Sequence, residues 1–268
     1  MREFNRYADT IDSNTIIETM KNEITVSDRV HIVPLGYEKD RILEPLRELK
    51  ADRVILLLHE NKGDDPWYHK EVKKTLREGP LDLEERDCNI FDMYGSIEKI
   101  ASIVDQHASD DVYVNLATGS KVTAIGGMIA CMLTNATPYY VRAKKYGPED
   151  EEGPPNNPVS AGVEGIDNLP SFHIDEPPAE QIRILRFVSE EGPVAKSNLI
   201  KFGRETNLPF MRNHNSKHRT GEYRLLDSHI IKPLLERDAI SVEEIGRRSE
   251  VRITDDGKNT LRAFNYLL

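Results

Sequence analysis

The stretch from Asn115 to Lys121, NLATGSK, contains residue types that could bind a phosphate or another anion. It lies between a strand-like run, 111–115, and an uncharged helix-like run, 122–134. Gly119 lets the backbone approach a ligand closely, and the free N–H groups at the start of the following helix attract negative charge. We call residues 115–121 the anion cradle.

A lysine in the first turn of a helix faces the positive end of the helix dipole, which is unfavourable unless an anion lies beside it. Lys121 occupies such a position. The residues of the cradle are explained equally well if Thr118 or Ser120 is an ordinary N-cap and the lysine is solvated. The cradle alone does not decide between these interpretations, so the elements around it must.

Apolar periodicity predicts that strands and helices alternate through the first part of the chain. We expect an α/β fold, with a Rossmann-like, mostly parallel sheet covered by helices on both faces. In such sheets ligands bind beyond the carboxyl ends of the strands, where Gly36, Tyr37, the loop 59–63 and the cradle would lie. The expected strands are 29–35, 52–59, 81–90, 111–115 and 137–143, and the expected helices are 39–50, 67–78, 96–107 and 122–134.

The helix expected at 122–134 has no charged residue, whereas surface helices normally keep one polar face. We therefore expect it to be buried on both sides, by the sheet and by a second protomer, with Gly126 and Gly127 allowing close approach. The alternative is a central helix covered by neighbours from the same chain. The first interpretation predicts a homodimer.

The second part of the chain follows a Pro-, Gly- and Asp-rich linker, 147–178, which could contribute a further strand at 166–174. A helix, a short helix and a longer helix with Pro233 as a kink precede a two-stranded hairpin and a closing helix from Thr254. This is the order of a winged helix-turn-helix. The helices are expected at 179–191, 195–205 and 217–237, and the hairpin strands at 240–242 and 251–253.

Basic residues fall at the two places where a winged helix would touch double-stranded DNA. Solvated surface charges explain any one of them, and only their grouping favours DNA binding. The candidates are Lys217, His218, Arg219 and Arg224 on the third helix, and Arg247 and Arg248 at the wing tip.

The net charge of -10 is divided unevenly along the chain. Residues 1–176 carry 20 Lys and Arg against 33 Asp and Glu, whereas residues 177–268 carry 16 against 13. Only the C-terminal part could therefore meet a polyanion over a broad surface. Cys88 and Cys131 lie in apolar contexts without metal-ligand spacing, so neither a disulfide framework nor a metal site is expected. No signal peptide or membrane span is recognisable, and we expect a cytoplasmic protein.

The whole pattern from residue 30 to 268 resembles the CARF (CRISPR-associated Rossmann fold) proteins fused to a winged helix-turn-helix, a type of archaeal transcriptional regulator. Family members carry Asn-x-(Ser/Thr)-Gly-Gly-(Ser/Thr)-Lys after a late strand, and the cradle is similar, with Ala117 for the first hydroxyl residue and Thr118 for the first glycine. The stretch from Arg252 to Gly257, RITDDG, resembles the wing of MarR-like regulators.

This resemblance implies a symmetric dimer in which two facing cradles bind one cyclic oligoadenylate, most often the tetra-adenylate, as an effector without any other cofactor. It divides the chain into an N-terminal extension at 1–29, a ligand-binding domain at 30–146, the linker 147–178 and the winged helix at 179–268. Ligand binding would shift the pose of the two DNA-binding heads. The expected ligand contacts are Gly36, Tyr37, Asn61, Tyr94, Asn115, Thr118, Gly119, Ser120, Lys121 and Arg142.

Two other functions stay open. Some CARF domains cleave their own cyclic ligand, and Ser120 and Lys121 would then orient the ribose hydroxyl and stabilise the developing charge. The cradle contains no histidine to act as a general base, which favours the sensor over the nuclease. A regulator that senses a different nucleotide or an anionic metabolite is the other alternative.

Overall fold

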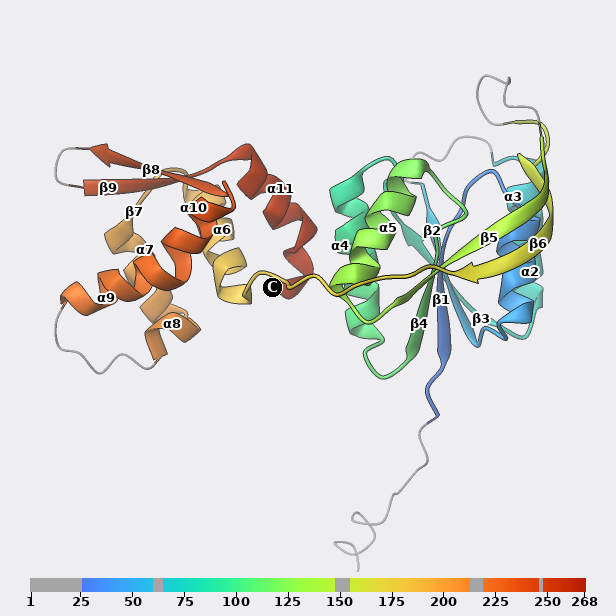
Figure 1. Ribbon diagram of the computed structural model, residues 1–268, viewed down its shortest axis with the longest axis horizontal. Helices are drawn as coiled ribbons and strands as arrows, with labels where there is room; N and C mark the ends of the chain where they lie inside the picture. The colour runs from blue at the N-terminus through green and yellow to red at the C-terminus, as the bar shows by residue number, and fades with distance from the viewer. Residues whose placement is uncertain (1–25, 60–64, 148–154, 213–218, 246–247) are drawn as a thin grey trace, which may run out of the picture.

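A six-stranded sheet forms the centre of the N-terminal part of the chain (Figure 1). The computed structural model describes residues 26–59, 65–147, 155–212, 219–245 and 248–268. The strands of this sheet are β1 (Arg29–Pro34), β2 (Arg53–Leu58), β3 (Asp82–Asp87), β4 (Asp111–Asn115), β5 (Thr137–Tyr146) and β6 (Ser160–Asn168). The helices around it are α2 (Asp40–Glu48), α3 (Trp67–Glu78), α4 (Met93–Gln106) and α5 (Lys121–Leu133).

The strand order is β3-β2-β1-β4-β5-β6, and all neighbours pair in parallel except β5 and β6. Helices α2 and α3 cover one face with one apolar cluster, and α4 and α5 cover the other with a second cluster (Figure 1). The continuous apolar runs of β1 and β2 are buried because both of their faces are covered. The predicted Rossmann-like fold is confirmed.

The sixth strand lies earlier in the linker than the sequence predicted. The expected strand 166–174 was wrong at both ends, since β6 covers Ser160–Asn168 and pairs antiparallel with β5. Pro170 cannot donate a ladder hydrogen bond, which helps to end the strand before it. The chain beyond it runs across the end of α5, where the N–H of Ile174 donates to the carbonyl of Met132 at 2.8 Å.

Helix α5 is covered by its own protomer where its two glycines lie. A Cβ on Gly126 would lie 2.9 Å from the Cβ of Ser96 in α4, and a Cβ on Gly127 would lie 2.7 Å from Leu116. The expectation that these glycines face a second protomer was therefore wrong, because they allow α4 and the sheet to approach. Burial of the remaining side of α5 by a second protomer stays a prediction, and Ile125 is 55% exposed in the single chain.

The C-terminal part is a winged helix. Its small sheet has the order β7-β9-β8, with antiparallel pairs, and the apolar faces of its helices form one core cluster. The strand β7 and the helix α8 were missed by the sequence pattern because each is too short to show a period. The elements are α6 (Ala179–Glu191), β7 (Val194–Ala195), α7 (Lys196–Glu205), α8 (Pro209–Arg212), α9 (Arg219–Leu226), a π-helical turn (Asp227–Ile231), α10 (Lys232–Glu236), β8 (Ile240–Ile245), β9 (Arg248–Ile253), α11 (Asp255–Ala263) and a 3₁₀ turn (Asn265–Leu267).

The long helix predicted up to residue 237 contains a π-helical turn just before Pro233. Proline has no N–H, so the carbonyl four residues earlier, that of His229, loses its helical donor. The side-chain amide of Gln181 donates to this carbonyl at 2.9 Å and replaces the lost bond. The helix therefore continues through the proline with a local change in its winding.

The two parts of the chain touch through α11 and α4, which lie side by side in Figure 1. Ile97, Leu133 and Ala263 are buried in a shared apolar cluster. Beside this cluster the guanidinium of Arg262 forms an ion pair with Asp92, the N-cap of α4. Among the described residues, no helix is long and apolar enough to cross a bilayer.

The motif around Gly257 fixes the start of α11. The side chain of Thr254 accepts a hydrogen bond from the N–H of Gly257 at 3.0 Å. The backbone N–H of Thr254 donates to the carbonyl of Ala239 at 3.1 Å. A Cβ on Gly257 would lie 2.0 Å from the same carbonyl oxygen. The glycine is required because the backbone of Ala239, just before β8, lies directly against the first turn of the helix.

Gly257→Ala should therefore lower the free energy of unfolding by about 1–3 kcal/mol, the usual cost of forcing a methyl group into a filled space. Denaturant unfolding followed by circular dichroism measures the change. Gly147→Ala is the control, since a Cβ there would lie 3.5 Å from its nearest neighbour. Equal stability of the two variants would contradict this account of the motif.

Candidate functional site

A cavity of about 680 Å³ lies at the carboxyl edge of the sheet, beside the point where the strand order reverses between β1 and β4. This is where ligands bind in open α/β sheets. Five predicted contacts line it together: Gly36, Tyr37, Gly119, Ser120 and Lys121. The other lining residues are Leu35, Leu58, His59, Asp65, Pro66, His69, Lys73, Glu85, Ile90, Phe91 and Val122.

Two glycines bring the turns after β1 and β4 into contact at the base of this cavity. A Cβ on Gly36 would lie 2.4 Å from the backbone nitrogen of Gly119. Gly119 has a φ of +82°, and a Cβ there would lie 2.7 Å from the side chain of Pro34. Because neither position has room for a side chain, the turn must carry glycine at both places.

Asn115 supports the cradle from beneath and does not face the cavity. Its amide nitrogen donates to the carbonyl of Arg41 at 3.0 Å, and its amide oxygen accepts from the N–H of Ala117 at 2.9 Å. The Arg41 carbonyl has no helical donor, because Pro45 lies four residues further along α2. The sequence assigned Asn115 to the ligand, and the structure corrects this, since the side chain is fully buried.

Thr118 is likewise part of the protein's own structure. Its hydroxyl donates to the carbonyl of Pro34 at 2.7 Å, and the residue is 2% exposed. This bond connects the cradle to the end of β1. The motif of the CARF proteins has a glycine at the position of Thr118. The hydroxyl of Thr118 is therefore used inside the protein, and the predicted contact of Thr118 with the ligand stays a prediction.

Ser120 caps α5, as one of the two sequence interpretations predicted. Its side-chain oxygen accepts from the N–H of Thr123 at 3.0 Å. The hydroxyls of Ser120 and Thr123 both donate to the carbonyl of Ile90, so the loop before α4 is bound to the start of α5.

Lys121 is exposed and lies on the wall of the cavity. Within the described part of the chain, its N–H and that of Val122 have no protein acceptor. The first turn of α5 thus presents two backbone donors, the positive end of its dipole and an ammonium group. Such an arrangement binds anions.

The sequence analysis missed a polar wall supplied by α3 and the loop before it. His69 is bonded through Nε2 to the carbonyl of Gly36 at 2.8 Å, and its Nδ1 lies 3.5 Å from Asp65. Lys73 forms a 2.7 Å ion pair with the same carboxylate. The spacing of these three residues by four positions, from the loop into the first turns of α3, is a signal that could have revealed them.

Aromatic rings complete the wall. Tyr37 is stacked on His69, with ring centroids 6.1 Å apart. His59 packs its ring edge-on against Phe91 at 5.2 Å, and Phe91 is 63% exposed. Rings of this kind can stack on nucleobases.

Glu38 lies beneath the two glycine turns and is 7% exposed. Burial raises the pKa of its carboxyl to about 7, although Arg41 and the backbone N–H groups of Glu38 and Gly119 favour its ionised form. Its Oε1 lies 3.6 Å from the guanidinium of Arg41, and its Oε2 has no hydrogen-bond partner among the described residues. A carboxyl in this state can change its protonation near neutral pH.

Two further predicted contacts, Tyr94 and Arg142, are not among the described residues that line the cavity. Tyr94 lies on α4 beneath the guanidinium of Arg262, 5.7 Å from its ring centroid, and so belongs to the contact with the winged helix. Arg142 lies on β5 and is paired with Asp167 and Glu164 of the neighbouring strand. The structure thus gives both side chains partners within the protein, and their contact with a ligand stays a prediction. Asn61 lies outside the described residues.

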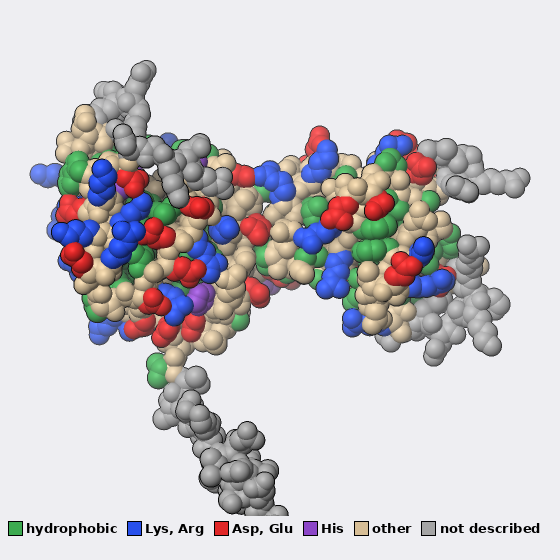
Figure 2. Space-filling model, turned by 180° about the vertical axis from the view of Figure 1, so that it is seen from behind, with side chains coloured by type: hydrophobic (Ala, Val, Ile, Leu, Met, Phe, Trp, Pro, Cys, Tyr) green, Lys and Arg blue, Asp and Glu red, His purple; other side chains and the backbone are tan. Residues whose placement is uncertain are grey.

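Three of the six predicted DNA-binding residues lie among the described residues. Arg224 is exposed on α9, while Arg219 begins that helix and Arg248 begins β9. Lys217, His218 and Arg247 lie outside the described residues. On the face of the molecule shown in Figure 2, acidic and basic side chains are interleaved over the N-terminal part.

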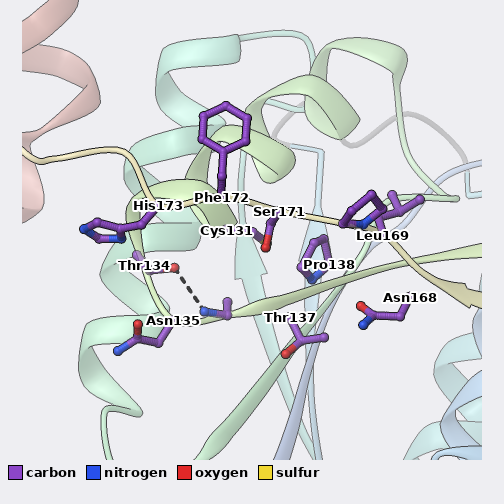
Figure 3. Close-up of a pocket in the computed structure, with 12 residues that line it drawn as sticks. Cys131, Thr134, Asn135, Thr137, Pro138, Asn168, Leu169, Ser171, Phe172 and His173 are labelled. Carbon is purple, nitrogen blue, oxygen red and sulfur yellow. Dashed lines mark hydrogen bonds between the residues drawn. The ribbon is translucent and has the colours of Figure 1, made fainter.

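A second cavity of about 420 Å³ lies at the opposite edge of the sheet, between the end of α5, the start of β5 and the segment after β6 (Figure 3). Thr134 accepts a hydrogen bond from the N–H of Ala136 at 3.4 Å across its floor. No lysine or arginine is among the described residues that line it, so these residues provide no permanent positive charge to bind an anion. Nor do the described residues contain a group of three or more His, Cys, Asp or Glu that could hold a metal ion.

Comparison with known families identifies both parts of the chain. Residues 29–146 match the model of the HFX_2341-like N-terminal domain, and residues 180–265 match the DUF6293 C-terminal winged helix domain. The chain joins these two domains. This combination agrees with the resemblance to CARF proteins that carry a winged helix.

The sequence identity to individual known proteins is low. The uncharacterized protein MJ1513 of Methanocaldococcus jannaschii is 26% identical over 189 residues, which span 61% of this chain and 56% of that protein. Can2 from Sulfobacillus thermosulfidooxidans, solved with cyclic tetra-adenylate, is 13% identical with a TM-score of 0.37, over 89% of this chain and 64% of that one. Enterococcus italicus Csm6, solved with cyclic hexa-2'-fluoro-hexa-dAMP, is 13% identical with a TM-score of 0.37, over 46% of this chain and 35% of that one.

The raised pKa of Glu38 makes a prediction about stability. Because its folded value of about 7 lies above the ordinary 4.5, its contribution to stability is complete below pH 4.5 and is lost as the pH rises through 7. As the pH rises from acidic to mildly alkaline, the unfolding free energy of wild type should therefore fall by up to about 3 kcal/mol relative to that of Glu38→Gln.

Denaturant unfolding over this pH range measures the difference. Glu48→Gln, at an exposed position at the end of α2, is the control. A difference between wild type and Glu38→Gln that stays constant with pH would mean that the pKa of the Glu38 carboxyl is not raised.

Proposed function

We propose that the chain is a DNA-binding regulator whose N-terminal domain senses a cyclic oligoadenylate, with the tetra-adenylate as its ring. The single observation that carries the ligand part is the cavity at the strand-order switch, which combines the free N–H groups of α5 with Lys121. A matched winged helix domain at residues 180–265 carries the DNA part. We expect the protein to work in the cytoplasm.

The chemistry of the cavity suits a nucleotide of this class. The phosphates of the ring would lie against the first turn of α5, where backbone donors and the ammonium of Lys121 face them. The bases would meet the aromatic wall that contains Tyr37 and Phe91. The cavity contains both an anionic and an aromatic subsite, whereas a small inorganic anion would use only the first.

A cyclic ligand also calls for a second protomer. The phosphates of the ring surround its axis, so one cradle can reach only part of them, and a two-fold axis would place a second Lys121 opposite the first. Ile125, 55% exposed one turn beyond the rim of the cavity, offers an apolar contact for such a partner. We therefore propose a homodimer through the exposed side of α5, with one ring shared by two chains.

Lys121→Ala should weaken binding of cyclic tetra-adenylate at least about tenfold, because each chain loses a charge-assisted hydrogen bond to a phosphate. Calorimetric titration of the full chain gives the affinity and the stoichiometry, for which we expect one ring per two chains. Lys145→Ala is the matched control, as an exposed lysine on β5 that does not line the cavity. Unchanged binding in Lys121→Ala would contradict this ligand position.

For the winged helix, Arg224→Ala should weaken binding to a mixed-sequence DNA duplex and reduce the salt slope of the affinity by about one for each bound chain. The physical reason is the loss of one contact between an exposed guanidinium and a phosphate. Lys232→Ala, further along the same helical stretch, is the control. Fluorescence anisotropy over a salt series measures both quantities, and an equal loss in the two variants would refute the role of Arg224.

Regulation requires that the ring change the DNA affinity. The loop that carries Ile90 and Phe91 lines the cavity, and it continues into Asp92, which is paired with Arg262 of the winged helix. A ligand that shifts this loop would act directly on the contact between the domains. The anisotropy series repeated with saturating ring tests this, since identical DNA affinities with and without ring would exclude coupling.

Cleavage of the bound ring is the second candidate, and one observation favours it. His59 lines the cavity, and its Nδ1 has no hydrogen-bond partner within the described residues, so a histidine is available although the cradle motif has none. It could take the proton of a ribose 2'-hydroxyl as that oxygen attacks the neighbouring phosphorus and the 5'-oxygen leaves. Incubation with labelled ring should then give linear products that His59→Ala does not form. If the ring stays intact, cleavage is excluded and the sensor function is the one that stands.

A further inference from the structure

The carboxyl of Glu38 occupies a position directly beneath the proposed ligand site. The point where a Cβ of Gly36 would lie is 2.4 Å from the Oε2 of Glu38 and 2.4 Å from the backbone nitrogen of Gly119. Both glycines line the cavity. The carboxyl is therefore separated from a bound ligand only by the backbone of the two turns.

Arg41 and the backbone N–H groups of Glu38 and Gly119 offset the burial of this carboxyl only in part. The guanidinium of Arg41 is the one cation within 4 Å of it among the described residues, and their atoms are 3.6 Å apart. Arg41 is held by other partners as well, since its Nε donates to the carbonyl of Val141 at 2.8 Å and its charge lies 5.2 Å from the ring of Tyr140. The Oε2 of Glu38 is buried and accepts no hydrogen bond within the described residues. A buried oxygen in this condition is more stable when it is protonated.

A negatively charged ligand would increase this preference. Phosphates placed against the first turn of α5 add negative charge close to Glu38, through protein and not through water, so their field is weakly screened. The pKa of Glu38 already lies near 7 without ligand. A further rise would convert the ionised fraction to the protonated acid at physiological pH.

We propose that Glu38 takes up a proton when an anionic ligand fills the cavity, so that the site binds the anion and the proton together. The proposal rests on the proposed function, because it requires an anion at the cradle. It makes Glu38 a positioning residue that does not touch the ligand and that discriminates against highly charged anions as the pH rises.

Other groups around the cavity also titrate, and the experiment must separate them from Glu38. These histidines, lysines and carboxylates set the local field. The groups concerned are Tyr37, His59, Asp65, His69, Lys73, Glu85 and Lys121. All of them are retained in Glu38→Gln, so the difference between this variant and wild type reports Glu38 alone.

The test is calorimetric titration with cyclic tetra-adenylate at a pH of about 7.5 in several phosphate-free buffers of different ionisation enthalpy. The dependence of the measured heat on the buffer gives the number of protons taken up. Wild type should take up about half a proton to one proton more than Glu38→Gln, and above a pH of about 8 its affinity should fall by about tenfold per pH unit relative to the variant.

Equal proton uptake in the two proteins would overturn the proposal while leaving the sensor function intact. A wild-type protein that binds no ring would instead overturn the proposed function, and this inference would fall with it. If Glu38→Gln does not fold, infrared difference spectra of the wild type with and without ring decide the matter, because a protonated carboxyl band must appear on binding. Its absence would refute the uptake.

Discussion

The shape of the ligand site depends on one buried amide. Asn115 bonds the turn that follows β4 to the carbonyl of Arg41 in α2, and at the same time it fixes the N–H of Ala117. These two bonds set the path of the backbone to Gly119, which must pass against Gly36 without a side chain between them. Since a buried amide that loses its partners is costly, the turn has little freedom to move. The direction in which α5 starts, and hence where its free N–H groups point, follows from this anchor.

The same device occurs in the second domain. A proline inside a helix frees a carbonyl, and a buried amide from another element takes it: Asn115 for Pro45, and Gln181 for Pro233. In both places the amide joins elements that are distant in sequence, β4 with α2 and α6 with the π-helical turn. The prolines that the sequence presents as breaks are therefore points where the tertiary structure is held together.

Local patterns predicted most of the fold. The apolar runs of β1 and β2 and the period of α3 could be recognised because each depends on a few neighbouring residues. The candidate site was less accessible. Lys121 and Gly119 follow from the rule that turns at the carboxyl edge bind ligands, but the partners of Asn115 and Thr118 come from α2 and β1, and no spacing within the cradle reveals them. The contact between Tyr94 and Arg262 could not be predicted for the same reason, because Arg262 lies far along the chain.

The site is also connected to the winged helix by a short physical path. Ser120 and Thr123 bind the carbonyl of Ile90, and two residues later Asp92 caps α4 and pairs with Arg262. The elements at the start of α5 and the elements that hold the winged helix are therefore connected by a continuous chain of hydrogen bonds and one ion pair. A ligand at the cradle and a duplex on the winged helix would act on opposite ends of it.

Hydrogen–deuterium exchange of the full chain, with and without saturating cyclic tetra-adenylate, tests most directly where the ligand binds. We expect the exchange of backbone amides to slow at 119–123, where the free N–H groups of α5 would bind phosphate, and at 88–92, where the loop lines the cavity. The segments around the second cavity, 131–138 and 168–173, should exchange as before. Slower exchange confined to those two segments, with 119–123 unchanged, would contradict the account.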